Sequence, residues 1–257
     1  MIPSEVGNQK VQNNGHFLDN FYQYLRVIVF SAVLSGIFSY YIYIRRGYFD
    51  LYIANKVLAG VAAVLLGLTL LVGSLSRHFN RFGFLARYRK EFGFIAAFLA
   101  IAHALVSYFT LSDHFPVKVY YTSIFWPFIF GLLSAVIIVL LLVISNNATM
   151  KKFGGSVWWF LQQWGARLAF IFLALHVFVM KFSSWVSWYQ TGGAANLKRP
   201  EWPGAGLLVG WFILFVVLIR FSELFGANAS KIFWYISTIA LPVIFVLTFF
   251  WGQQFVK

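Results

Sequence analysis

The chain has 257 residues, of which 61% are hydrophobic and 21% aromatic, while only 11% carry charge, and the formal net charge is +13. A soluble domain of this length carries roughly twice that share of charged residues, so the composition indicates a bilayer environment. Because there is no cysteine, disulfides, thiolate-held iron–sulfur clusters, cysteine nucleophiles and cofactors attached through thioether bonds are excluded. The length suits one membrane domain without an added soluble catalytic domain.

The N-terminal segment, residues 1–24, is polar and is expected to be cytoplasmic. It lacks a basic start followed by an apolar core, and so it does not have the pattern of a cleavable signal peptide. We therefore expect the first apolar run to remain in the protein as a helix.

Seven apolar runs follow that are long enough to cross ~30 Å of hydrocarbon as helices. Together they predict an all-α polytopic membrane bundle of about seven transmembrane helices over residues 25–251, with a short tail at 252–257. The sixth run is short and the seventh contains Pro242, so these two are the least certain to span. The runs lie near residues 25–44, 55–74, 91–112, 123–145, 159–181, 205–222 and 232–251.

The basic residues lie mostly between these runs, which is typical of the positive-inside rule and of contact with anionic lipid rather than of a nucleic-acid surface. The stretch 75–90 carries five arginines and lysines and no acidic residue, and 146–158 adds two lysines. We therefore place both stretches and the N-terminus on the cytoplasmic side, with the C-terminus outside. The longest link, 182–204, is rich in tryptophan, which favours an anchor at the membrane interface over a lid or docking face.

Two of the five histidines, His103 and His176, lie deep within apolar runs, whereas His16, His78 and His114 lie in polar or interfacial sequence. An ionisable side chain at that depth is costly and is a candidate functional residue. For one such histidine, a simple hydrogen bond to a neighbouring helix is an equally good explanation.

The levels of the two histidines favour a shared site. The third and fifth runs cross in the same direction, and each histidine lies 13 or 14 residues beyond the start of its helix, or about 20 Å at about 1.5 Å per residue. Two neutral imidazoles facing each other at one level can provide both axial ligands of a haem iron. Small residues around His103 leave room for a flat macrocycle, although they also suit close helix packing; they are Ala96, Ala97, Ala100, Ala102, Ala104 and Ser107.

The stretches 89–108 and 145–176 resemble the ferric reductase-like transmembrane domain superfamily, and within it the haem-binding membrane subunits of bacterial periplasmic methionine sulfoxide reductase systems. The likeness covers roughly residues 50–182 and includes Arg89, Gly93 and His103 in the third helix and Trp159 and His176 toward the fifth. It implies a six-helix core plus an extra helix, in a bacterial inner (cytoplasmic) membrane. It also implies one haem b held by His103 and His176.

The resemblance also implies a second, inner haem, whose ligand position in the fifth helix is occupied here by Gln163. Since glutamine is not a normal haem ligand, the inner haem is expected to be lost. Arg89 matches an arginine of that inner site, but a positive-inside anchor is the better explanation. Arg167 is expected to meet either haem propionates or lipid headgroups, and Arg220 to extend to headgroups.

These features predict a non-catalytic electron-transfer subunit of an oxidoreductase system. Its donor would be membrane quinol or a cytoplasmic flavin reductase, and its acceptor a separate extracytoplasmic redox protein. The main alternative is a haem-free scaffold subunit of a larger membrane complex. A chlorophyll-type or quinone site using a single histidine is a third possibility, and a transporter is disfavoured because no span carries an acidic residue near its middle.

Overall fold

The computed structural model describes the backbone of residues 4–256 and the side chains of residues 19 and 21–256. The described chain is helical and contains no strand, and seven of its helical segments are long and apolar enough to cross a membrane. The predicted all-α membrane bundle is therefore confirmed. The long helices are α1 (Ser4–Arg46), α2 (Leu51–His78), α3 (Arg89–Leu105), α5 (Phe125–Ile144), α7 (Gly155–Thr191), α8 (Ala205–Ser222) and α9 (Ala227–Gly252).

Shorter helices complete the links. They are the 3-10 turns Asn80–Tyr88, Glu223–Phe225 and Gln253–Phe255, the π-helix Val106–Thr110, and the short helices α4 (Val117–Tyr120) and α6 (Asn147–Phe153). Local sequence features agree with the observed starts of the helices. Asp50 caps α2 by accepting a bond from the Ile53 amide at 2.7 Å, and Pro127 lies in the first turn of α5, where its missing N–H is harmless.

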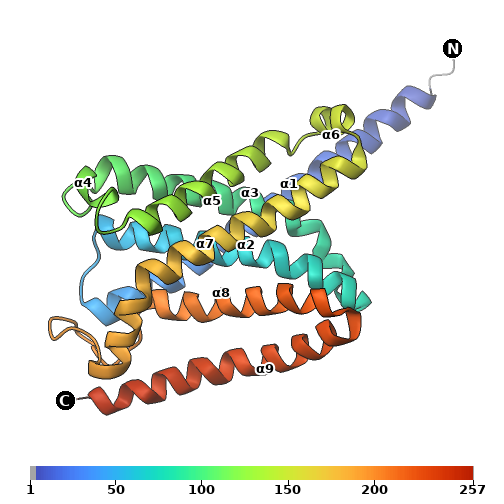
Figure 1. Ribbon diagram of the computed structural model, residues 1–257. Helices are drawn as coiled ribbons and strands as arrows, with labels where there is room; N and C mark the ends of the chain where they lie inside the picture. Colours follow the sequence, from blue (N-terminus) through green and yellow to red (C-terminus); the bar gives the residue numbers. More distant parts are fainter. Residues whose placement is uncertain (1–3, 257) are drawn as a thin grey trace.

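The bundle has two ends, called here the near end and the far end (Figure 1). The near end carries the links 79–88 and 145–154, and the far end carries the links 47–50, 111–124 and 192–204. The helix α1 begins beyond the near end, and α9 finishes at the far end. Because the number of crossings is odd, the described chain begins at one end of the bundle and finishes at the other.

Two helices are longer than their apolar runs predict. The helix α1 begins at Ser4, so the polar segment 1–24 is largely a continuation of the first span; residues 1–3 and most side chains up to residue 20, including that of His16, lie outside the described part. The helix α7 continues to Thr191, which reduces the predicted link 182–204 to 192–204. Tryptophans of this segment pack within the protein: Trp188 is 5% exposed, and Trp185 lies against Gly210 of α8.

The helix α2 forms the centre of the bundle. Of its most apolar stretch 67% is buried, against 11–17% for α1, α3, α5, α7 and α9. It packs against α1, α3, α7 and α8, and apolar side chains such as Ile53, Val61 and Leu65 are fully enclosed. The outward faces of the other helices carry large apolar side chains, as expected where lipid replaces water as solvent.

Four helices form a ring around the position of the two histidines. The helix α3 packs on α2 and on α5, and α7 likewise packs on α5 and on α2. Across the described chain, α3 and α7 have almost no direct contact with each other. The ring order α2–α3–α5–α7 therefore leaves space between the two helices that carry His103 and His176.

Candidate functional site

A cavity of about 540 Å³ opens between these helices and extends to the far-end parts of α1 and α8, and it is lined by both histidines. Ligand sites commonly have volumes of about 300–1,000 Å³ and mostly apolar walls with a few placed polar groups. Much of this wall is made of residues with little or no side chain: Ala59, Gly60, Ala63, Ala100, Ala104, Gly131 and Ala135. Of the small residues near His103, Ala100, Ala104 and Ser107 line the cavity, whereas Ala96 and Ala97 are buried in helix packing.

The ring of His103 is held by Asn55 of α2. Its Nδ1 lies 3.0 Å from the side-chain Oδ1 of Asn55 and 3.2 Å from the backbone carbonyl of the same residue. The Asn55 amide donates to the hydroxyl of Ser107 at 2.8 Å, which turns its oxygen toward the imidazole. Ser107 lies in the π-helical turn that follows α3, a local widening often found at functional sites.

The ring of His176 is held by α5. Its Nδ1 lies 2.7 Å from the carbonyl oxygen of Pro127. The ring also packs directly on Gly131, because a Cβ built at that glycine would lie 2.8 Å from Nδ1. A glycine is therefore required here by the close approach of the imidazole.

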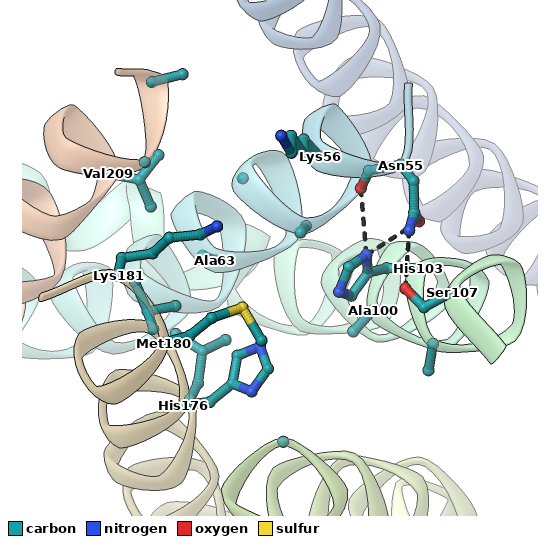
Figure 2. A pocket seen from close by; sticks show the side chains of 18 of the residues that line it. Asn55, Lys56, Ala63, Ala100, His103, Ser107, His176, Met180, Lys181 and Val209 are labelled. Carbon is teal, nitrogen blue, oxygen red and sulfur yellow. Dashed lines mark hydrogen bonds between the residues drawn. The ribbon is translucent and has the colours of Figure 1, made fainter. Parts of the chain in front are cut away.

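These contacts fix the tautomer of both histidines. Carbonyl oxygens only accept, so each Nδ1 carries the hydrogen and donates it. Each Nε2 then presents a lone pair, and neither has a hydrogen-bond partner among the described side chains and backbone. Figure 2 shows the two imidazoles beside the same space, one from α3 and one from α7. A neutral imidazole whose other nitrogen donates to a carbonyl is the usual arrangement of a histidine that binds a metal.

A bare metal ion would be short of ligands in this cavity. No group of three or more histidine, aspartate or glutamate side chains gathers anywhere in the part of the chain that the structure describes. Two imidazoles alone do not complete the four ligands of a zinc site. They do complete the coordination of a metal that already has four nitrogen ligands from a macrocycle.

The charged groups of the cavity wall are all cations. Lys56 of α2 and Lys181 of α7 line it, as do Arg45 and Arg46 at the end of α1, and no aspartate or glutamate of the described chain is among its lining residues. Arg45 donates to the carbonyl of Trp202 at 2.8 Å, and Arg46 to the hydroxyl of Tyr48 at 2.8 Å. The cavity thus combines apolar walls, two open imidazole nitrogens and a positive region.

The other residues predicted for the site lie toward the near end and not in the cavity. Gln163 is 13 residues before His176 in α7, about 20 Å along the helix, and it is half-buried. Its neighbour Gln162 donates to the carbonyl of Leu141 at 3.3 Å. Arg89 packs against Gly73 of α2.

Arg167 belongs to a cluster around Glu223. The carboxylate of Glu223 lies 2.8 Å from Arg220, 3.2 Å from Arg167 and 3.7 Å from Arg77, and its side chain is only 8% exposed. The expectation that Arg220 extends to headgroups is therefore wrong, because Arg220 forms an ion pair with the buried carboxylate of Glu223, three residues away.

No protein-family model matches the chain, and a search of curated proteins finds no significant match.

Several residues of the site were not expected from the sequence. Asn55 is a polar side chain inside an apolar run and is 3% exposed, so its position could have identified it as a partner of another buried polar group. Lys56 and Lys181 lie at the ends of their predicted spans, where basic residues are common, so the sequence does not set them apart. The contact of Gly131 with His176 depends on how α5 and α7 pack, and the sequence carries no sign of it.

Proposed function

We propose that the chain is a membrane electron-transfer subunit carrying one b-type haem, with His103 and His176 as its two axial ligands. The observation that carries the proposal is the matched state of the two histidines. Each Nδ1 donates to a carbonyl oxygen, at 3.0–3.2 Å and 2.7 Å, and each Nε2 is left open beside one cavity. A histidine that only satisfies a packing need would not require a second one in the same condition across an apolar space.

The chain's own residues would perform positioning and electrostatic work. Asn55 and the Pro127 carbonyl would fix the ring orientations and raise the basicity of both imidazoles. The small residues of α2, α3 and α5 would admit the macrocycle, and the apolar walls would exclude water and so tune the potential. When bound, the haem iron supplies one-electron oxidation and reduction.

Position along the bundle bears on the direction of transfer. His103 lies seven residues before Thr110, the last residue of the third crossing, so the haem would lie about 10 Å from the far end. If the far end is extracytoplasmic, as the basic near-end links indicate, the acceptor is an extracytoplasmic redox protein. Membrane quinol or a cytoplasmic flavin reductase would supply the electrons, in an inner membrane with the N-terminus in the cytoplasm.

The near end supports the proposal of one haem rather than two. Gln163 occupies the level at which a second ligand would be needed, Arg167 is paired with Glu223, and Arg89 packs against Gly73. The absence of a histidine at the position of Gln163 also favours the rival function, a haem-free scaffold subunit of a larger complex. The two functions differ in whether the purified protein is coloured.

The test is a reduced-minus-oxidised spectrum of the detergent-purified chain from haem-replete cells. We expect a sharp α-band at close to one haem per chain, lost in both His103→Ala and His176→Ala. His78→Ala is the matched control, because His78 ends α2 at the near end, and it should keep the spectrum. A colourless preparation of folded protein would contradict the proposal and favour the scaffold.

A further inference from the structure

Two lysines of the cavity wall have no counter-ion. The ammonium groups of Lys56 and Lys181 form no salt bridge or hydrogen bond with any described residue, and the cavity lining includes no carboxylate. By contrast, Arg45 and Arg46, which reach the same wall, each have a hydrogen-bond acceptor. Among the described residues, the two lysines are therefore the cations of this wall without an ion-pair or hydrogen-bond partner.

Both lysines lie close to the histidines. Lys56 follows Asn55, the residue that holds His103. Lys181 is five residues beyond His176, about 7.5 Å farther along α7 toward the far end. Figure 2 shows the ammonium ends of both lysines on the same side of the two imidazole rings.

Extension of these side chains into the headgroup region does not account for the arrangement. The Nζ of Lys56 lies 3.7 Å from the centroid of the Tyr52 ring, so it is retained within the bundle. Both side chains are half-buried and contribute to the cavity wall. A half-buried cation without an anionic partner is unfavourable in a membrane, which favours an occupant of the cavity that brings negative charge.

We infer that Lys56 and Lys181 bind the carboxylate groups of the cavity's ligand, so that the two lysines form an anion-binding end of the site. This inference rests on the proposed function, and it fixes the orientation of the haem. A haem held by the two imidazoles would have its propionates on the far-end side of the site, one at each lysine. Neutral planar ligands are disfavoured by the same charges.

The experiment compares haem with its dimethyl ester, in which the propionates are neutral. Apo-protein from haem-deficient cells is titrated with each porphyrin, for the unaltered chain, Lys56→Met, Lys181→Met and the double variant. Each substitution should weaken haem binding about tenfold while changing ester binding by less than about threefold. The matched control is Lys118→Met, an exposed lysine in the 111–124 link, which should change neither.

The midpoint potential of the bound haem is a second measurement on the same variants. Removing a cation near the iron stabilises the ferric form, so the potential should fall in each lysine variant and fall further in the double variant. Equal losses of haem and ester affinity, or no loss of either, would overturn this inference while leaving the two-histidine site intact. If the unaltered chain binds neither porphyrin with a two-histidine spectrum, the proposed function itself is wrong.

Discussion

The near end and the far end of the bundle both place basic side chains among apolar helices, and they differ in what balances the charge. At the near end, the carboxylate of Glu223 lies within 2.8–3.7 Å of three arginines. At the far end, the cavity wall holds four basic residues and no carboxylate. The near-end cluster thus contains its own anion, whereas the far-end cavity depends on an anion from outside the chain.

The polar atoms of the two regions also differ. Near-end charges are paired through Glu223, although His78 Nε2, Glu91 Oε2 and the Nε atoms of Arg167 and Arg220 are buried without partners among the described residues. In the cavity, by contrast, the supporting bonds are complete at each histidine Nδ1, and the open atoms all face the space. Open atoms from two helices beside one apolar cavity indicate a ligand site.

The largest effect that would test this comparison is expected for Glu223→Gln. Removing the shared carboxylate leaves Arg77, Arg167 and Arg220 with like charges at close range, and breaking a buried ion pair costs about 3–5 kcal/mol. Because Arg77 is 53% exposed, we expect the lower part of that range in the free energy of unfolding. Denaturant titration in mixed micelles is the measurement.

Glu201→Gln is the matched control for that change. Glu201 is equally buried, but its single partner, Arg199, is 54% exposed at 3.5 Å, so its loss should cost about 1 kcal/mol or less. Haem content should be unchanged in both variants, because neither glutamate lines the cavity. A loss of haem in Glu223→Gln at full stability would mean that the near end is also part of the site.

A smaller effect, confined to the cavity, is expected for Gly131→Ala. The added Cβ would lie 2.8 Å from His176 Nδ1 and 3.2 Å from Cε1, so the imidazole must move and its bond to Pro127 must weaken. Loss of a supporting contact to a metal ligand typically lowers affinity by 10–100-fold. We expect haem affinity to fall by about tenfold, with a changed low-spin spectrum, in a spectral titration.

Gly165→Ala provides the control at the same pair of helices. Its Cβ would meet the end of the Leu141 side chain at 2.7 Å, a comparable clash between α5 and α7 that involves no histidine. A flexible leucine can move aside, so this variant should keep its haem affinity. Equal losses in the two variants would show that helix spacing, and not the histidine contact, controls binding.

The sequence predicted the helices better than it predicted the contacts between them. Long apolar runs define membrane helices because the bilayer forces every backbone group to bond within its own segment, and all seven expected helices are long and apolar enough to span. His103 and His176 could be singled out because charge-bearing side chains are rare at such depth. Gln163 and Arg89 were linked to the site by resemblance, and they lie outside the cavity that holds the histidines.

What the sequence could not supply was the pairing across helices. Asn55 meets His103 from another crossing, 48 residues away, and Glu223 meets Arg167 across 56 residues. Apolar helices of similar composition can pack in many orders, so periodicity alone does not define neighbours. Arg220 was misjudged for this reason: its position near a helix end indicated headgroups, while its bond to Glu223 depends on the turn that follows α8.

The smallest expected effect concerns Asn55, whose side chain adds one acceptor to a histidine that also has a backbone carbonyl. Asn55→Leu removes that acceptor, and the weaker electron donation from His103 should raise the midpoint potential. A neutral hydrogen bond contributes roughly 1 kcal/mol, or about 40 mV for a one-electron couple. Asn55→Asp offers a stronger acceptor and should lower the potential, giving the order Asp, Asn, Leu in a redox titration. Ser107→Ala, which only frees the Asn55 amide, should shift it less than either. If the order is reversed, or Leu and Asp shift the potential in the same direction, then His103 does not donate electron density to the haem through this bond.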